Sequence, residues 1–283
     1  MELSAYFGKI AGCGLLALFA AAAVAPQDGA AAARKVTGRK APPAGPRCPV
    51  SGTAMASLAK VLDGETFLTA DGREVRLAGV LAQGAGGEAA LSPLTATARA
   101  NLAAALNGGA ITIAPVEDAP DRYGRILAQV FAGDAWVQGS LLQAGAVRMA
   151  PDRAASPCAK QLTAAEEKAR ADRAGHWGNG VFSLRTPEQV KSRAGSFQAV
   201  EGMVTTATTY KGRAYINFGP DYRTDFTVTV APADMKLFRA ARFDVKGLAG
   251  KRVRVRGWVE LYNGPEMQIA TPAAIEMLDE RRD

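Results

Sequence analysis

Histidine and cysteine are both scarce in this sequence. Its 283 residues include one histidine, His176, and three cysteines. No two cysteines have the short spacing of zinc ligands, so we do not expect a zinc site. Hydrolysis that depends on histidine would have to rest on His176 alone. Because His176 follows a predicted helix, within the segment Gly175-His176-Trp177-Gly178, we expect it to have a packing or surface role.

Long apolar runs are also rare, and the clearest one extends from Ile10 to Ala25, directly after Lys9. A short charged segment, a brief apolar run and a stretch of small residues are typical of an export signal. We therefore predict a signal peptide over residues 1–33 and a periplasmic or secreted protein. The alternative is an uncleaved segment that anchors the protein to the inner membrane, although the run is rich in alanine and short for a spanning helix.

The formal net charge of +7 is concentrated near the N-terminus. The segment 34–47 carries five cations, no acidic residue and three prolines. We predict that residues 34–55 form a basic linker rich in proline and alanine. The alternative is that this linker contacts an anionic membrane or nucleic acid.

Two cysteines, Cys48 and Cys158, follow the predicted signal peptide. An even number of cysteines in an oxidising compartment favours a disulfide. We predict that this bond joins the start of the first domain to the approach of its last helix. Two unpaired thiols are the alternative.

Two Asp-Gly pairs divide the following stretch into short runs of β-prone residues. Asp63-Gly64 and Asp71-Gly72 are strong signals for hairpin turns. We predict strands at Leu58–Val61, Thr66–Ala70 and Glu74–Gly79 that form an antiparallel meander.

Helical and β-prone segments then alternate. A helical pattern over Ser92–Asn107 is followed by predicted strands at Ala110–Pro115 and Ile126–Phe131. Two more helices are predicted at Trp136–Ala144 and Lys160–Ala174. This order of elements predicts an OB-type barrel with a helical C-terminal subdomain.

A second series of short strands follows a predicted linker at residues 183–196. The predicted elements are strands at Phe197–Thr206, Gly212–Phe218, Thr224–Ala231, Arg252–Leu261 and Glu266–Ala270, and a helix at Pro232–Ala241. The predicted fold class is therefore mainly β with α. It consists of two OB-type barrels of five strands each, at residues 56–182 and 197–280, and the first carries the helical subdomain.

The motifs DGETFLTADGREVRLAGV, DRYGRILAQVF and WVQGSLLQAGAVRM, with a charged helix that ends in GHWG, resemble the thermonuclease (staphylococcal-nuclease-like) family. The resemblance implies calcium-assisted attack of water on a phosphodiester, with carboxylates on the metal and two arginines on the phosphoryl oxygens. It implies that Arg76 and Arg125 are these arginines and that Tyr123 is a binding residue. Glu65 takes the position of the first metal-binding aspartate.

The sequence departs from the family pattern on the metal side of the site. Leu81 stands where the resemblance implies a second metal-binding aspartate, and Gly84 where it implies the glutamate that activates water. One carboxylate, Glu65, makes an incomplete calcium site. We therefore expect no cofactor and a degenerate nuclease. Calcium is expected only in the alternative, a variant phosphodiesterase in which Asp63 or Glu88 supplies further oxygens.

The leading functional hypothesis is a non-catalytic exported module that binds single-stranded nucleic acid or another anionic polymer. Arginines 254 and 256 share one face of a predicted strand, which we expect to be exposed, and Trp258 follows them. We expect about two of the aromatic residues of this domain to be exposed, out of Tyr210, Tyr215, Phe218, Tyr222 and Trp258. An envelope protein is the alternative partner, and a membrane would be contacted through an uncleaved N-terminal segment alone.

Overall fold

The computed structural model describes residue 48, residue 50 and residues 52–83, 93–107, 109–151 and 158–278. The predicted signal peptide, the basic segment 34–47, Gly84 and Glu88 lie outside the described residues. Pro43–Asp283 forms one compact unit. Within the described ranges, no helix is long and apolar enough to cross a membrane.

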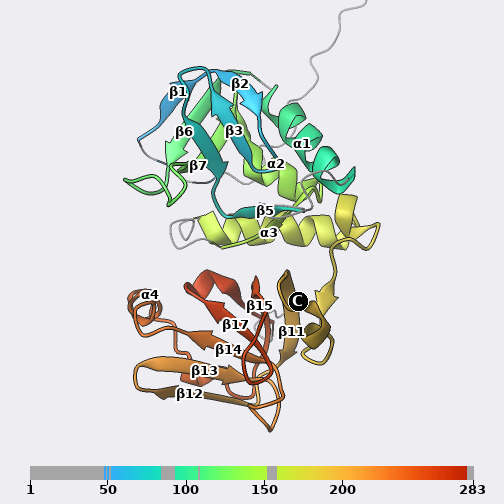
Figure 1. Cartoon of the computed structure of the whole chain (residues 1–283), viewed down its shortest axis with the longest axis vertical. Coiled ribbons are helices and arrows are strands. Elements are labelled where there is room, and N and C mark those ends of the chain that lie inside the picture. Colours follow the sequence, from blue (N-terminus) through green and yellow to red (C-terminus); the bar gives the residue numbers. More distant parts are fainter. Residues whose placement is uncertain are drawn as a thin grey trace, which may run out of the picture. The chain divides into compact units, whose positions relative to one another are not determined.

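Figure 1 shows the elements of the described residues between 48 and 182, which we call the first part. Their buried apolar side chains form one hydrophobic core. In chain order they are β1 (Ala54–Ala56), β2 (Leu58–Val61), β3 (Thr66–Thr69), β4 (Glu74–Leu77), β5 (Val80–Ala82), α1 (Pro93–Leu106), β6 (Ile111–Pro115), β7 (Ile126–Ala132), β8 (Ala135–Trp136), α2 (Val137–Gln143), β9 (Val147–Met149), α3 (Ala159–Ala171) and the 3-10 helix η3 (Gly175–Trp177).

The main sheet of the first part has the strand order β1-β6-β7-β4-β3-β2, and β8 pairs with β7. Strands β2, β3 and β4 form the predicted antiparallel meander, and β4 continues the sheet by pairing in parallel with β7. β5 and β9 form a separate two-stranded sheet. Among the described residues these pairings form an open path, so no closed barrel is detected.

The meander forms because its sequence alternates and its second turn suits glycine. Val75 and Leu77 of β4 are fully buried, whereas Glu74, the first residue of this strand, is exposed. This alternation is expected for a strand with one face on the core. Gly72 has a φ of 83°, a conformation that costs other residues energy. Helix α1 covers this core with Ala98, Leu102 and Leu106, a spacing that places them on one helical face.

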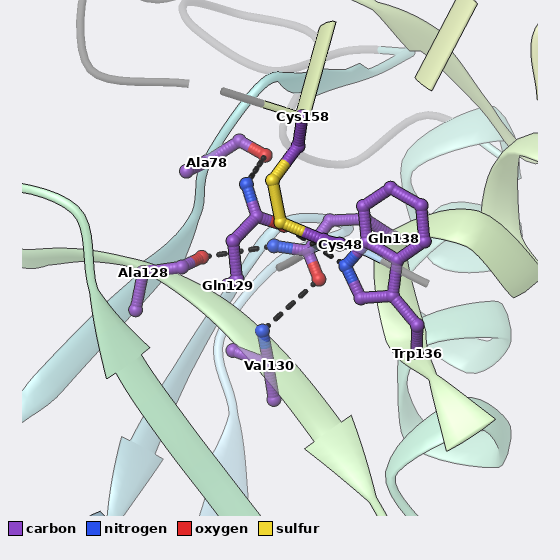
Figure 2. Close-up of a disulfide and its surroundings, with 8 residues drawn as sticks. All are labelled: Cys48, Ala78, Ala128, Gln129, Val130, Trp136, Gln138 and Cys158. Atoms are coloured by element: carbon purple, nitrogen blue, oxygen red, sulfur yellow. Dashed lines mark hydrogen bonds between the residues drawn. A yellow bond between two sulfur atoms is a disulfide. The ribbon is translucent and has the colours of Figure 1, made fainter. Parts of the chain in front are cut away.

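The predicted disulfide between Cys48 and Cys158 is present, with a Cα–Cα distance of 5.2 Å. Both cysteines are buried, and Cys158 immediately precedes α3. Figure 2 shows polar side chains beside the bond that are satisfied by hydrogen bonds. Gln138 accepts from the Val130 amide at 3.1 Å and donates to the Ala128 carbonyl at 2.8 Å. The indole of Trp136 donates to Gln129 at 2.9 Å, so these buried polar groups pair within the core.

The elements from residue 184 to residue 278, which we call the second part, form two sheets around a second core. In chain order they are β10 (Leu184–Arg185), η4 (Gln189–Arg193), β11 (Phe197–Met203), β12 (Thr206–Tyr210), β13 (Arg213–Asn217), β14 (Thr227–Val230), α4 (Met235–Ala240), η5 (Lys246–Leu248), β15 (Arg252–Trp258), β16 (Glu260–Leu261), β17 (Pro265–Ile269), η6 (Pro272–Ala274) and β18 (Ile275–Met277).

One sheet of the second part has the order β10-β11-β15-β18 and the other the order β12-β13-β14-β17-β16. The structure confirms that the chain is mainly β with helices. Two segments that were each expected to form one strand are divided between the two sheets. In Phe197–Thr206 the chain changes sheet between β11 and β12, and in Arg252–Leu261 it changes sheet between β15 and β16.

Candidate functional site

Glu65 is held in place by the turn between β2 and β3. The Asp63 carboxylate accepts a hydrogen bond from the Glu65 amide at 2.8 Å, which fixes the turn locally. A Cβ at Gly64 would lie 2.6 Å from the Cβ atoms of both Ala82 and Ala98. Glycine is therefore needed here for close packing against β5 and α1, and this packing buries Glu65.

Both carboxylate oxygens of Glu65 have partners. Arg76 on β4 donates from Nε to Oε1 at 3.0 Å, and the Ala82 amide donates to Oε2 at 2.9 Å. The side chains of Glu65 and Arg76 are 6% and 18% exposed. Burial raises the pKa of Glu65 above its ordinary value, although the positive charge of Arg76 opposes this shift. The predicted metal ligand thus belongs to a buried ion pair.

The described residues do not fit a calcium ion. Calcium takes roughly six to eight oxygen ligands, and the described part of the chain contains no group of three acidic, histidine or cysteine side chains able to hold a metal. Leu81, at the position of the implied second aspartate, lies on β5 and is buried. Gly84 stands at the implied water-activating position, and Glu88 belongs to the alternative set of ligands. Both residues lie outside the described residues.

Arg125 is paired with an acid of its own turn. The Asp121 carboxylate accepts from Nε of Arg125 at 2.9 Å and from the Arg125 and Tyr123 amides at 3.0 and 2.9 Å. Burial acts to raise the pKa of Asp121, but the hydrogen bonds from Arg125 and Tyr123 outweigh it and hold this pKa below its ordinary value. Both arginines of the implied phosphate side therefore face a carboxylate.

Tyr123 projects from the same turn and is 65% exposed. The guanidinium carbons of Arg122 and Arg125 lie 4.8 and 5.1 Å from the centre of its ring. Arg122 makes no ion pair with any other described residue. An exposed ring flanked by two cations can stack on a base while the cations approach phosphates.

A pocket of about 200 Å³ opens beside Arg76 and Leu81. Its remaining walls include Pro151 from the first part and Arg256 and Trp258 from the second part. Trp258 is 48% exposed and lies edge-on to Phe197, as predicted for an accessible aromatic side chain. The Arg76 side chain is thus reached through a small space that residues of both parts enclose.

The prediction that Arg254 and Arg256 face solvent is wrong. They do lie on one face of β15, but they are 6% and 2% exposed. Arg254 donates to Glu276 at 2.8 Å, and it also donates to Glu201 at 2.8 Å from Nε. Arg256 donates to Glu166 of α3 at 2.6 Å. A spacing of two residues shows which side chains share a face, but it does not show what covers that face.

His176 has the packing role that we expected. It is 5% exposed and lies edge-on to Phe182 at 4.9 Å between ring centres. Burial lowers its pKa, and a weak contact with Asn179 opposes this shift.

The residues that join the two parts were not predicted from the sequence. Glu166 accepts a hydrogen bond from the Met149 amide at 2.8 Å as well as the bond from Arg256. Arg148 donates to the Phe197 carbonyl at 2.8 Å, and burial lowers its pKa to about 10. One feature of the sequence could have indicated this role of Glu166. It lies at helical spacing from Leu162 and Ala169, on the buried face of α3. A charged residue on such a face indicates a buried partner.

The structure has an antiparallel meander, an arginine on its third strand and an Asp-Arg-Tyr-Gly-Arg turn before β7, as the resemblance to the thermonuclease family implies.

Residues 74–179 match the family model described as Staphylococcal nuclease homologue. The matched range begins at β4 and ends after η3, within the predicted first domain, and it supports an OB-type fold there. No curated protein matches the chain.

Proposed function

We propose that this protein is an exported, non-catalytic module built on a nuclease-like domain, and that it binds single-stranded nucleic acid without hydrolysing it. One observation carries the non-catalytic part of the proposal. Both oxygens of the buried Glu65 carboxylate accept hydrogen bonds that hold the side chain in place, one from Arg76 and one from the Ala82 amide. Moving Glu65 toward a metal ion would leave Arg76 and that amide without these bonds, a loss that is costly for buried groups.

The exposed ring of Tyr123 supports the choice of ligand. It offers a stacking surface with Arg122 and Arg125 against it, and single strands are bound by this combination of aromatic and cationic side chains. The basic segment 34–47 would add sequence-independent attraction to phosphates. An envelope protein is the alternative partner. Periplasmic or secreted localisation and an OB-type fold for residues 197–280 also belong to this proposal.

The second candidate is a calcium-dependent phosphodiesterase. It is favoured by the match to the nuclease family and by the retained pair Arg76 and Arg125. In that case residues such as Glu88 would supply the missing oxygens.

The test is an assay of the full protein with denatured DNA, once with calcium and once with a chelator, together with a binding titration. We expect binding, loss of binding with added salt, and no cleavage that depends on calcium. Tyr123→Ala should weaken binding about tenfold, since stacking of one base contributes roughly 1–3 kcal/mol. Chelator-sensitive cleavage that both Arg76→Ala and Arg125→Ala abolish would overturn the proposal in favour of the phosphodiesterase. Neither binding nor cleavage of DNA would overturn the choice of ligand and point to a protein partner.

A further inference from the structure

The second part contains a groove that the nuclease-like site does not explain. It has a volume of about 520 Å³ and lies over the sheet β12-β13-β14-β17-β16, a size typical of small-ligand sites. Its lining side chains are four tyrosines, three threonines, two asparagines and one glutamate. No aliphatic side chain and no lysine or arginine is among them. This composition differs from that of both an apolar core and a phosphate-binding surface.

The strand register explains why these residues gather on one face. Tyr215 of β13 lies opposite Thr208 of β12 and Thr229 of β14. Two residues further along, Thr227 lies between Asn217 and Glu266. Successive side chains of a strand point to opposite faces, so the residues between them lie on the other side. Those residues, Ile216, Val228 and Met267, are fully buried in the core of the second part.

The floor of the groove is fixed by hydrogen bonds. The Thr229 hydroxyl donates to Oε1 of Glu266 at 2.7 Å, and the Thr227 hydroxyl donates to Oδ1 of Asn217 at 3.0 Å. Thr227 and Thr229 are 8% and 1% exposed. These bonds hold the threonine and asparagine side chains in one orientation. Since a hydroxyl or carboxylate oxygen can accept more than one hydrogen bond, the floor still presents acceptors to a ligand.

Tyrosine rings form the walls. Tyr210, Tyr222 and Tyr262 are 64%, 57% and 72% exposed. Tyr262 stands in the β16–β17 turn, beside Asn263 with its φ of 50°. In the described part of the chain, no hydroxyl of these three tyrosines makes a hydrogen bond. Each therefore offers both a flat ring and a free polar tip to a ligand.

The charge of the groove distinguishes between two classes of polymer. Glu266 is the acidic group of the lining, and a carboxylate in the floor repels a phosphodiester backbone. The nearby cations lie at the rim, where Lys211 and Arg223 lie 5.3 and 5.4 Å from the ring centres of Tyr210 and Tyr222. Arg213 lies beside the floor, where it donates to the Thr229 hydroxyl at 3.4 Å and to Gln268 at 3.1 Å, but it is not among the lining residues. A single strand would need cations along its path, and this floor has none among its lining residues.

A neutral sugar fits these groups better. Sugar hydroxyls donate hydrogen bonds to carboxylate and hydroxyl oxygens such as those of Glu266 and the floor threonines. The C–H faces of a sugar ring carry partial positive charge and pack against the negative face of an aromatic ring. We propose that this groove binds a neutral oligosaccharide, with the tyrosines stacking on sugar rings and Glu266 accepting from their hydroxyls. This inference is independent of the function proposed above for the nuclease-like part.

The experiment is a calorimetric titration of the full protein with two neutral β-1,4-linked tetrasaccharides, one of glucose and one of N-acetylglucosamine. Oligothymidylate is titrated in parallel. We expect at least one tetrasaccharide to bind, with an affinity that added salt leaves unchanged. Tyr222→Ala and Tyr262→Ala should each weaken it about tenfold. Met203→Ala is the matched control, because Met203 is 55% exposed in the same part but does not line the groove. It should leave tetrasaccharide binding unchanged.

Glu266→Gln separates the two ligand classes. It should weaken tetrasaccharide binding, because the amide loses one acceptor oxygen. If the groove instead holds nucleic acid, the same change would strengthen oligothymidylate binding by removing a repulsive charge, and the tyrosine variants would weaken it. That result would overturn the inference, as would the failure of both tetrasaccharides to bind. If Tyr123→Ala is the one variant that loses oligothymidylate binding, nucleic acid binds at the first part and the groove assignment stands. Circular dichroism checks that each variant is folded.

Discussion

Removing the disulfide between Cys48 and Cys158 should destabilise the first part strongly. The bond joins residues that are 110 positions apart. In the chain-entropy model, a closed loop of this length lowers the entropy of the unfolded chain by about 16 cal/mol/K, or about 4.8 kcal/mol at 25 °C. Because unfolded chains keep residual structure, we expect a loss of about 3 to 5 kcal/mol in the free energy of unfolding.

The assay is urea denaturation of the wild type and of a Cys48→Ala, Cys158→Ala double variant, followed by tryptophan fluorescence. Of the three tryptophans, Trp136 and Trp177 lie in the first part, with Trp136 beside the disulfide (Figure 2), whereas Trp258 lies in the second part. If two unfolding transitions appear, the transition of the first part should occur at a lower urea concentration in the double variant. The control is the wild type unfolded in reductant, which should match the double variant because both lack the cross-link.

A small effect would refute this reasoning. If the double variant unfolds within about 1 kcal/mol of the oxidised wild type, the loop does not restrict the unfolded chain as the model requires. If reductant lowers stability but the double variant does not follow, the loss comes from free thiols buried in the core instead of from chain entropy.

Two further predictions concern buried charges. Arg256→Met should lower the free energy of unfolding by about 3 to 5 kcal/mol, because it removes the nearer cation from the buried carboxylate of Glu166 and leaves Arg170 at 3.9 Å. Lys236→Met on the exposed surface of α4 is the control, and an equal effect of both would contradict the role of the ion pair. Glu65 has a raised pKa in the folded protein, so its contribution to stability is present below pH 4.5 and is lost as pH rises through the folded pKa. The stability of the wild type relative to Glu65→Gln should therefore fall as pH rises; if it rises instead, the attraction of Arg76 outweighs burial.

The sequence was most informative where local chemistry decides the structure. The Asp-Gly turns, the alternation in β4 and the helical spacing of α1 were predicted because each depends on a few neighbouring residues. The disulfide was also predicted, since the number of cysteines after the predicted signal peptide left one pairing. Strands β5 and β9 were not predicted as a pair, because their contact joins segments far apart in the chain.

Only some features of the candidate site were predictable from the sequence. The sequence showed that Leu81 cannot ligate a metal and that Glu65 is a lone acid at its position. It did not show that Glu65 would be buried against Arg76, since that depends on Gly64 packing against β5 and α1. The prediction that Arg254 and Arg256 are exposed was wrong for a related reason. Their common face was predictable, but the carboxylates that cover it come from other elements, with Glu201 and Glu276 beside Arg254 and Glu166 beside Arg256. Tyr262 was missed because it lies in a turn that brings it over the β12–β14 face.

The ion pair between Glu166 and Arg256 has a consequence for where this chain can be cut into separate domains. Glu166 belongs to the part that matches the nuclease family, whereas its buried cation belongs to β15. Cutting the chain at the polar stretch 183–196 would separate two opposite charges that water does not reach. The boundary that is visible in the sequence is therefore not an energetic boundary. Each part, separated from the other, would present one member of this ion pair without its partner.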